Sequence, residues 1–218
     1  MFMSKIQLDM AQSSRLGVYE AHQALWRLFS DSPDRRRDFL YRRLDNASFL
    51  TVSDRQPEKR PFVSRLEVKE YAPKLANGDR VLFSLRFNPV VKRREPKEGN
   101  RRGRQVRVDM VQDERMRQMR EGVKTKPRLE IAQDVTLQWL EKRQQTLGLT
   151  LEKETVMAEA YDQSRFGSGG GNKAVVLSCI DARGFATVSD VAQLENALFH
   201  GVGAAKGFGF GLLLVRRA

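Results

Sequence analysis

Residues 17–31, GVYEAHQALWRLFSD, bring together side chains that can transfer protons and side chains that can bind a phosphate. His22 is one of only two histidines in the chain, and histidine titrates close to neutral pH, which suits general acid–base catalysis. In a helix, a rotation of about 100° per residue places Tyr19 and His22 one above the other. Both side chains could then reach one bound group. A histidine that only packs on the flank of a helix fits the same spacing, so the residues alone leave both interpretations open.

The periodicity of this stretch predicts how a helix would orient its side chains. One arc collects the apolar residues that should meet a core, namely Val18, Ala21, Leu25, Leu28 and Phe29. The flank of the helix then carries Tyr19, His22, Trp26 and Ser30. Arg27 lies beyond them, toward solvent. For Trp26, and for Trp139 further along the chain, packing is a better interpretation than stacking on nucleic acid bases.

The composition is typical of a globular protein, with 218 residues of which 40% are hydrophobic and 30% charged. That length fits one large or two modest domains, and we favour two. No run of about 18 apolar residues could span a membrane, and the first thirty residues lack the apolar block of a signal peptide. The lone Cys179 excludes an internal disulfide and fits a reducing compartment. We therefore expect a cytoplasmic protein with no membrane partner.

The net charge of +12 and the pI near 10.2 indicate a polyanionic partner. The charge is concentrated between Arg86 and Arg107, where nine basic and two acidic residues give a net +7. This run favours contact with the phosphates of a nucleic acid, and Arg101, Arg102 and Arg104 are its candidate binding residues. A flexible, solvated loop is the alternative. An anionic membrane surface fits less well, because the run has no amphipathic apolar face.

The pattern of elements predicts an α+β protein with two tandem ferredoxin-like (RRM-like) domains joined by a basic linker. Alternating or apolar runs predict strands around residues 6–10, 38–45, 47–53, 63–71 and 80–89. Pro127 and Gly148 bracket a helix. Strands at 150–160, 173–181, 184–188 and 208–216 and a helix at 189–199 complete a β-α-β-β-α-β order. The expected borders are an N-terminal domain at 1–91, a linker at 92–104 and a C-terminal domain at 105–218.

The C-terminal stretch HGVGAAKGFGFGLLLV is rich in glycine between a helix and a final strand. Its backbone can approach another chain closely, and its amides can face phosphates. We take Gly203, Lys206 and Gly207 as candidate RNA-binding residues. The spacing is neither that of a Walker loop nor that of a Rossmann motif, because no strand precedes the glycines. A helix end followed by a strand that tolerates glycine is the alternative interpretation.

The remaining histidine and cysteine do not indicate a second reactive centre. His200 ends the last predicted helix, where a cation suits the helix dipole. Two distant histidines and one strand cysteine form no ligand cluster, so we expect no metal site, no cofactor and no thiol nucleophile.

With these features combined, the sequence resembles the Cas6e (CasE, Cse3) family of CRISPR RNA-processing endoribonucleases. The resemblance runs nearly end to end. It rests on the order and spacing of four stretches: MSKIQLDM, YEAHQALWRLF, LRFNPVVK followed by basic residues, and GVGAAKGFGFGLLLV. One departure is Ala204, where the family's glycine loop is expected to have proline.

The resemblance implies two ferredoxin-like domains and metal-independent cleavage of a repeat hairpin in precursor CRISPR RNA. Attack by a ribose 2′-hydroxyl would leave a 2′,3′-cyclic phosphate and a 5′-hydroxyl. It also implies that the mature crRNA is retained and that other Cascade subunits are partners.

The resemblance further assigns catalysis to Tyr19 and His22, with Arg27 and Ser30 further along the same helix. A tyrosine hydroxyl is better suited to orient or donate a hydrogen bond than to act as a free base at neutral pH. Arg27 and Ser30 could hold phosphate oxygens. Family members use a basic hairpin in this region to enter the RNA groove, and the corresponding basic residues here are Arg165 and Lys173. Without the resemblance, the stretch 164–173 that contains them is typical of a flexible hairpin tip.

Two rivals remain from the sequence. One is a non-catalytic RNA-binding subunit of a ribonucleoprotein complex, which keeps binding without cutting. The other is a structural subunit whose positive charge only docks it to RNA. Which residue acts as base and which as acid, the repeat sequence and the cut position do not follow from the residues.

Overall fold

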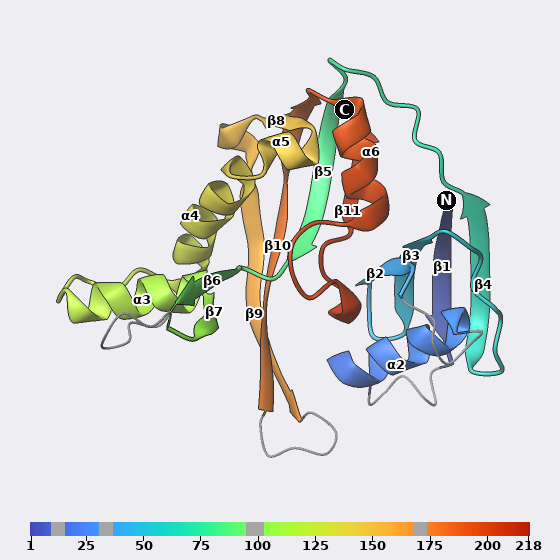
Figure 1. Ribbon diagram of the computed structural model, residues 1–218, viewed down its shortest axis with the longest axis horizontal. Coiled ribbons are helices and arrows are strands. Elements are labelled where there is room, and N and C mark those ends of the chain that lie inside the picture. Colours follow the sequence, from blue (N-terminus) through green and yellow to red (C-terminus); the bar gives the residue numbers. More distant parts are fainter. Residues whose placement is uncertain (10–15, 31–36, 95–102, 168–173) are drawn as a thin grey trace.

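The computed structural model describes residues 1–9, 16–30, 37–94, 103–167 and 174–218. Two sheet-based units lie side by side, each with its own hydrophobic core (Figure 1). Helices, together with sheets whose described strand pairs are all antiparallel, make the chain an α+β protein, as predicted. None of the helices in the described ranges is long and apolar enough to cross a membrane.

The first unit is a four-stranded antiparallel sheet, and helix α2 packs on it. Its elements are β1 (Phe2–Leu8), α2 (Val18–Phe29), β2 (Phe39–Arg43), β3 (Ser48–Ser53) and β4 (Val63–Glu70). The spatial order β2-β3-β1-β4 is that of a ferredoxin-like sheet. Residues 54–62, where that fold would have its second helix, form no helix. The unit is therefore the distorted copy that its sequence predicts.

The second unit contains a complete β-α-β-β-α-β pattern with additional elements. They are β5 (Arg80–Phe87), β6 (Val90–Arg94), β7 (Gln105–Asp109), α3 (Met110–Arg120), α4 (Arg128–Glu141), α5 (Gln144–Leu147), β8 (Leu149–Leu151), η1 (Lys153–Thr155), β9 (Met157–Gly167), β10 (Ala174–Val188), α6 (Val191–His200), η2 (Lys206–Phe208) and β11 (Leu213–Arg217). The sheet order is β11-β5-β10-β8, and β9 also pairs with β10. The prediction of two ferredoxin-like units is thus confirmed.

The expected border at residue 91 does not coincide with the border between the sheets. β5 was expected in the N-terminal domain, but it pairs with β10 over eight residues and with β11 over five, in the second sheet. The crossing between the units is the segment 71–79, between β4 and β5. The alternation of a strand indicates which of its faces is buried, but not which sheet it joins, so the sequence placed β5 with its neighbours along the chain.

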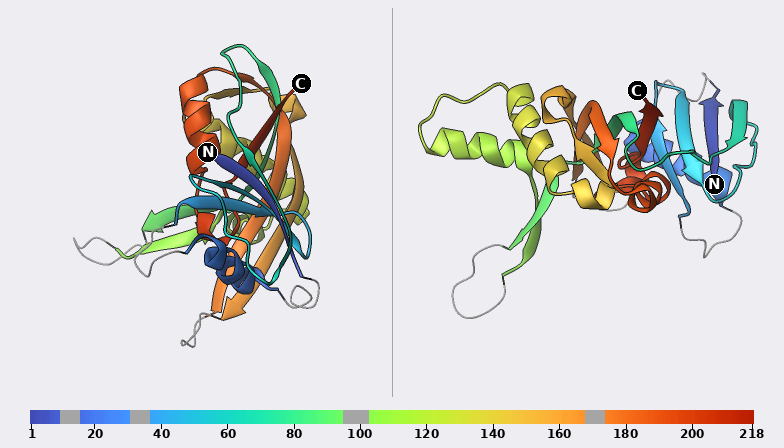
Figure 2. Two further views of the ribbon diagram at one scale, coloured as in Figure 1. Left: turned by 90° about the vertical axis from the view of Figure 1, so that its right-hand side faces the viewer. Right: turned by 90° about the horizontal axis from the view of Figure 1, so that it is seen from above.

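The expected basic linker at 92–104 also differs from the structure. β6 and β7 pair antiparallel as a hairpin, with Val90 opposite Asp109 and Arg94 opposite Gln105. Both ends of this hairpin connect to elements of the second unit, so it is an excursion from that unit and does not join the two. Figure 2 shows it projecting from the body, at the end away from β1–β4.

Other predicted elements changed in length more than in type. The two strands expected at 173–181 and 184–188 form one long strand, β10, in which Gly184 lies close to Val156 and Phe83. The helix bracketed by Pro127 and Gly148 breaks into α4 and the short α5. The polar helix α3 was not predicted, because only Val111 and Gln118 of its residues are buried.

The interface between the units combines apolar packing with a charged contact. Leu40 and Val52 of the first sheet pack with Leu212 in a small buried cluster. Beside it, Arg42 of β2 donates to Ser84 Oγ at 2.7 Å and pairs with Asp181 of β10 at 3.4 Å. Asp181 also accepts two hydrogen bonds from Arg86, at 2.7 and 2.8 Å. These contacts fix how the first sheet meets the second.

The glycine-rich segment before β11 reaches across this interface. A substitution at Gly211 measures how tightly this segment is packed against its neighbours. Gly211 has φ +82°, its amide donates to the Arg86 carbonyl at 2.7 Å, and a Cβ there would collide with the Val202 carbonyl oxygen. We predict that Gly211→Ala lowers the free energy of unfolding by roughly 3 kcal/mol or more, because it adds a backbone clash to the conformational strain.

Gly78→Ala is the matched control for this prediction. Gly78 has a similar φ of +90°, but nothing lies within 4 Å of a Cβ at that position. Its replacement should cost about 1–2 kcal/mol, from the left-handed backbone alone. Urea unfolding of both variants measures the difference, and equal losses would show that the segment yields to the added methyl group.

Candidate active site

Helix α2 is anchored by the apolar face that its sequence predicts. Ala21, Leu25, Leu28 and Phe29 are buried, and only Val18 of the predicted face is half-exposed. The Phe29 ring stacks on Phe39 of β2 with centroids 4.2 Å apart. This packing sets the rotation of the helix on its sheet, and so fixes the direction of the residues on its flank.

The flank of α2 lines a pocket of about 380 Å³. Its lining residues are Tyr19, His22, Gln23, Trp26 and Arg27. Three of the residues singled out in the sequence, Tyr19, His22 and Arg27, are thus brought together. Ser30 is the C-cap of α2, after the last helical residue, and does not line this pocket.

Aromatic rings from the second unit close over the same flank. The Phe208 ring of η2 lies 5.2 Å from the His22 ring, centroid to centroid. Phe166 of β9 lies 5.5 Å from Phe208 and stacks on Tyr19 at 6.3 Å. His22 is therefore enclosed by side chains from both units, although it belongs to the first.

The glycine-rich segment meets α2 at Gly207. A Cβ built on Gly207 would lie 3.8 Å from His22 Cε1 and only 2.8 Å from Arg37 Nη1. The adjacent Lys206 donates from Nζ to the His200 carbonyl at 2.8 Å. Of the predicted glycines, Gly207 is at the site, whereas Gly203 lies against the Trp139 ring.

Arg37 is a site residue that sequence reasoning missed. It lies two residues before the start of β2, in a run of three arginines at 35–37 whose sequence alone suggests a solvated turn. Its position in the sequence was the available signal. Arg37 comes shortly before β2, and β2 packs on α2, the helix that carries His22. Its burial lowers the pKa of the Arg37 guanidinium, while the nearby Tyr41 acts in the opposite direction.

The environment of His22 favours the neutral imidazole. Burial is the main cause that lowers the pKa of His22, and the charge of Arg37 adds to it, whereas a hydrogen bond to the Gly207 backbone opposes them. The pKa of Lys206 is likewise lowered by burial and by Arg37. Within the described ranges, the buried Nδ1 of His22 and the buried hydroxyl of Tyr41 have no hydrogen-bond partner.

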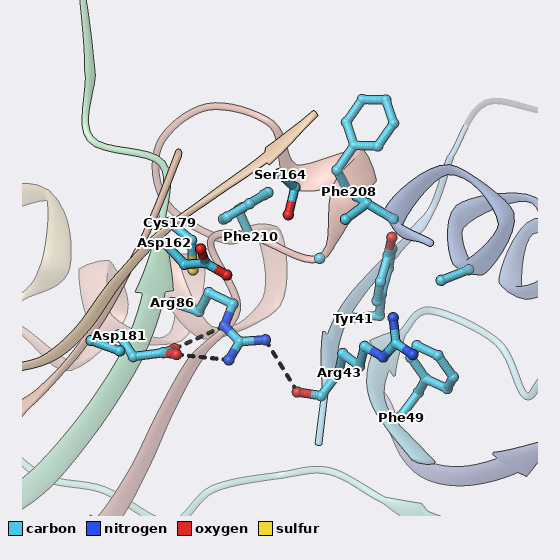
Figure 3. A pocket seen from close by; sticks show the side chains of 14 residues that line it. Tyr41, Arg43, Phe49, Arg86, Asp162, Ser164, Cys179, Asp181, Phe208 and Phe210 are labelled. Carbon is cyan, nitrogen blue, oxygen red and sulfur yellow. Dashed lines mark hydrogen bonds and ion pairs between the residues drawn. The ribbon is translucent and has the colours of Figure 1, made fainter. Parts of the chain in front are cut away.

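A second pocket, of about 290 Å³, lies between the units directly behind α2 (Figure 3). Tyr41, Arg43 and Phe49 line it from the first unit, while Arg86 and Asp181 line it from the second. Cys179 is a further lining residue. Burial raises the pKa of the Cys179 thiol to about 12, so the thiol is protonated near neutral pH, in keeping with the expectation that it is no nucleophile.

The other predicted RNA-binding residues are distributed away from His22. Arg165 is exposed on β9, next to Phe166 and so on the opposite face of that strand. Arg104 is exposed just before β7, in a hairpin on the other side of β9 and β10 from α2 (Figures 1 and 2). Arg101, Arg102 and Lys173 lie outside the described residues.

His200 lies at the end of α6, as predicted, with Nδ1 3.2 Å from the Asn196 carbonyl oxygen. Among the residues that the structure describes, no three His, Cys, Asp or Glu side chains are grouped as a metal site would require.

Comparisons with known proteins give consistent relationships. A family model described as CRISPR associated protein matches residues 1–217. The chain is 26% identical over 223 residues to the CRISPR system Cascade subunit CasE of Escherichia coli (strain K12), covering 98% of both chains. It is 22% identical to the crystal structure of Cas6e from E. coli K-12, with a TM-score of 0.60 and complete coverage of both. It is also 22% identical to a CRISPR endoribonuclease Cse3 bound to a 19-nucleotide RNA, with a TM-score of 0.70 and coverage of 99% and 100%.

The lowered pKa of His22 predicts how stability depends on pH. The unfolded chain binds a proton at His22 near pH 6.5, whereas the folded chain does so only at lower pH. The unfolded state therefore holds more protons in this interval, and the free energy of unfolding falls as the pH drops through it. Urea unfolding at pH 7.5 and 5.5 should show a larger loss for the native protein than for His22→Gln.

The imidazole itself can be followed by NMR, with His200→Gln used to assign the other histidine. The His22 resonance should titrate with a midpoint below 6.5, and Arg37→Gln should raise that midpoint because it removes a nearby positive charge. A His22 midpoint at or above 6.5 would contradict the prediction.

Proposed function

The chain belongs to the family of CRISPR-associated proteins, as its resemblance to Cas6e indicated, and we propose that it is an endoribonuclease that cleaves repeat hairpins in precursor CRISPR RNA. The observation that carries this proposal is the position of His22, in a pocket with Tyr19 and Arg27 where both units of the fold meet. Its relatives include a Cascade subunit and an RNA-bound endoribonuclease.

The proposed reaction is an internal transesterification. The ribose 2′-oxygen loses its proton and forms a bond to the adjacent phosphorus, and the bond from phosphorus to the 5′-oxygen breaks. The departing oxygen takes up a proton, which gives a 2′,3′-cyclic phosphate and a 5′-hydroxyl. The chain must therefore align the RNA, move two protons and stabilise the negative charge on the phosphorane.

His22 is the residue best suited to proton transfer. Because its pKa is lowered, the imidazole is neutral at neutral pH and can accept the proton of the 2′-hydroxyl. Tyr19 then serves as a hydrogen-bond donor, its ring held against Phe166. Arg27 and Ser30, later on the same helix, would hold phosphate oxygens, Arg27 through its planar fork.

RNA binding is assigned to the basic surface of the second unit. An A-form hairpin is read mainly by its shape and its phosphates, so it suits cationic residues spread over a wide surface. Arg104, Arg165 and Lys206 are the described members of this set, and Arg101, Arg102 and Lys173 complete it. After cleavage the chain would retain the mature crRNA and join other Cascade subunits.

One rival function is favoured by a specific observation. The half-buried His22 between Trp26 and Phe208 would also suit a packing role. A subunit that binds crRNA without cutting it would have the same surface. The two functions differ in what a His22 substitution removes.

Cleavage of a labelled repeat hairpin in EDTA tests the proposal directly. We predict that His22→Ala reduces the single-turnover rate by about 10²- to 10⁴-fold, the usual contribution of a general acid or base, at nearly unchanged RNA affinity. His200→Ala is the matched control, because it removes the other histidine from an exposed helix end, and it should retain the native rate. Native products should carry cyclic phosphate and 5′-hydroxyl ends.

Tight binding by the native protein without any cut would instead favour the rival function. Cutting that stops in EDTA and returns with Mg²⁺ would contradict metal independence while leaving the nuclease assignment intact.

The salt dependence of RNA binding tests the basic surface separately from catalysis. The logarithm of the association constant should fall linearly with the logarithm of the salt concentration, by about 0.7–0.9 per phosphate contact. Arg104→Gln should reduce this slope by about 1 if Arg104 contacts a phosphate. Arg65→Gln makes the same change of charge on β4, at the edge of the first sheet where Arg65 pairs with Glu67. That variant should leave the slope unchanged.

A further inference from the structure

Polar groups from three segments converge beside Gly207 of the glycine-rich segment. His22 comes from α2, Arg37 from the residue pair before β2, and Lys206 from η2. Tyr41 of β2 is close enough to Arg37 for each to influence the pKa of the other. Gly207 has no side chain, and the Arg37 guanidinium occupies the position where one would project.

The polar atoms in this cluster are unusually unsatisfied. His22 Nδ1 and the Tyr41 hydroxyl are both buried and, within the described ranges, accept or donate no hydrogen bond. A buried polar atom without a partner is destabilising, and such atoms are rare in folded proteins. Two such atoms lie around the Arg37 guanidinium, which indicates that their hydrogen bonds form only when a ligand is bound there.

The charges of the cluster are also uncompensated, in contrast to the arginines next to it. Arg86 makes two hydrogen bonds to Asp181, and Arg42 pairs with the same carboxylate. Arg43 donates to three backbone carbonyls, those of Leu16, Asp45 and Asn46. For Arg37, no ion pair with an acidic side chain is found among the described residues, and its positive charge acts on both Lys206 and His22.

We propose that Arg37 and Tyr41 complete the cleavage site as a binding pair for the scissile phosphate. Arg37 donates to a non-bridging phosphate oxygen next to His22, and Lys206 provides the second positive charge. Once the phosphate is bound, the Tyr41 oxygen, which has no partner among the described residues of the free protein, accepts an N–H from Arg37 and so orients its planar fork. Tyr41 is thus a positioning residue, whereas Arg37 contacts the substrate. This assignment rests on the proposed nuclease function.

The geometry explains why the ligand is a phosphate and why it is the reacting one. A phosphodiester has one negative charge, and a second one develops as the phosphorane forms; two neighbouring cations can compensate this charge, whereas a neutral base or sugar offers none. A Cβ built on Gly207 would lie 2.8 Å from Arg37 Nη1 and 3.8 Å from His22 Cε1, so the guanidinium and the imidazole are close to the same point. A phosphate bound by Arg37 is therefore adjacent to the group that transfers the proton. Negative charge grows on the non-bridging oxygens as the phosphorane forms, so a fixed fork there stabilises the transition state more than the ground state.

The neighbouring pocket behind α2 is a weaker candidate for that phosphate. Figure 3 shows the Arg86 guanidinium directed to Asp181 and to the Arg43 carbonyl oxygen, and the Tyr41 oxygen directed toward Phe208. The Arg43 side chain donates to three backbone carbonyls. With Asp162 and Asp181 in the lining, positive and negative groups balance there.

Phosphorothioate substrates test the contact with Arg37. The repeat hairpin is made with sulfur at either non-bridging position of the scissile phosphate, and single-turnover rates are measured. The native protein should discriminate between the two isomers, and Arg37→Gln should cut the normal substrate about 100-fold more slowly and lose that discrimination. Arg37→Lys should restore part of the rate but not the discrimination. Arg65→Gln, with the same change of charge at an exposed position on β4, should behave as the native protein.

Tyr41→Phe separates a functional hydroxyl from a structural one. It keeps the buried ring and removes only the atom that lacks a partner, so the free energy of unfolding should be unchanged or higher. The cleavage rate should still fall, by about 3- to 10-fold. Reduced stability together with an unchanged rate would overturn the role of Tyr41.

Binding of inorganic phosphate gives a readout that does not need cleavage. In the native protein, phosphate should shift the His22 resonances and raise the midpoint of its titration, and both effects should be absent in Arg37→Gln. If the native protein cuts RNA while Arg37→Gln keeps the rate and the isomer discrimination, the inference is wrong and the nuclease function stands. If the native protein does not cut but responds to phosphate through Arg37, the anion site stands and the nuclease function fails. A His22 resonance indifferent to phosphate in both proteins would overturn the anion site.

Discussion

The candidate site depends on one close approach, between the glycine-rich segment of the second unit and helix α2 of the first. At Gly207 a guanidinium fills the space of a side chain, and at Gly209 the Tyr41 ring does so, 2.8 Å from where a Cβ would be. A side chain at Gly209 would collide with the buried Tyr41 ring in a backbone conformation that favours glycine (φ +85°), whereas one at Gly207 would displace the Arg37 guanidinium. The glycines therefore have a steric role: they bring two units of the fold to within one side chain of each other.

This approach would not hold without a fixed orientation of the two sheets. Asp181 receives Arg86 from its own sheet and Arg42 from the other, so a single carboxylate fixes β2 relative to β5 and β10. The buried Leu40, Val52 and Leu212 exclude water next to it. Since β2 also carries Tyr41 and follows Arg37, the strand that makes the interface is the one that places the anion-binding groups. Rotation of one sheet relative to the other would move Arg37 and His22 together, but it would separate both from Lys206.

Much of the first unit follows from the sequence, because its signals are local. The apolar arc of α2 and the alternation in β2, β3 and β4 depend on residues a few positions apart, and their structures agree with the prediction. The membership of β5 depends on a partner strand about one hundred residues later, and local periodicity contains no information about it. Helix α3 was missed because few of its residues are apolar and buried, and its surface is satisfied by ion pairs such as those of Arg117 with Glu114 and Glu121. Arg37 was missed for a related reason. In the sequence it belongs to a basic run that is typical of a solvated turn, and only the tertiary structure shows that it packs against Gly207.

The pattern of satisfied and unsatisfied groups distinguishes the site from the rest of the interface. Within a short distance, Arg42, Arg43 and Arg86 have their hydrogen bonds, while the Tyr41 hydroxyl and His22 Nδ1 do not. Groups left unpaired in this way make the free protein less stable than it could be, and a ligand that pairs with them stabilises the folded state by its binding energy. The proposed nuclease, which would remain bound to its product, accommodates this arrangement well. In the proposed reaction the negative charge that satisfies the cluster is present in the substrate phosphate and would still be present, as the cyclic phosphate, after the cut.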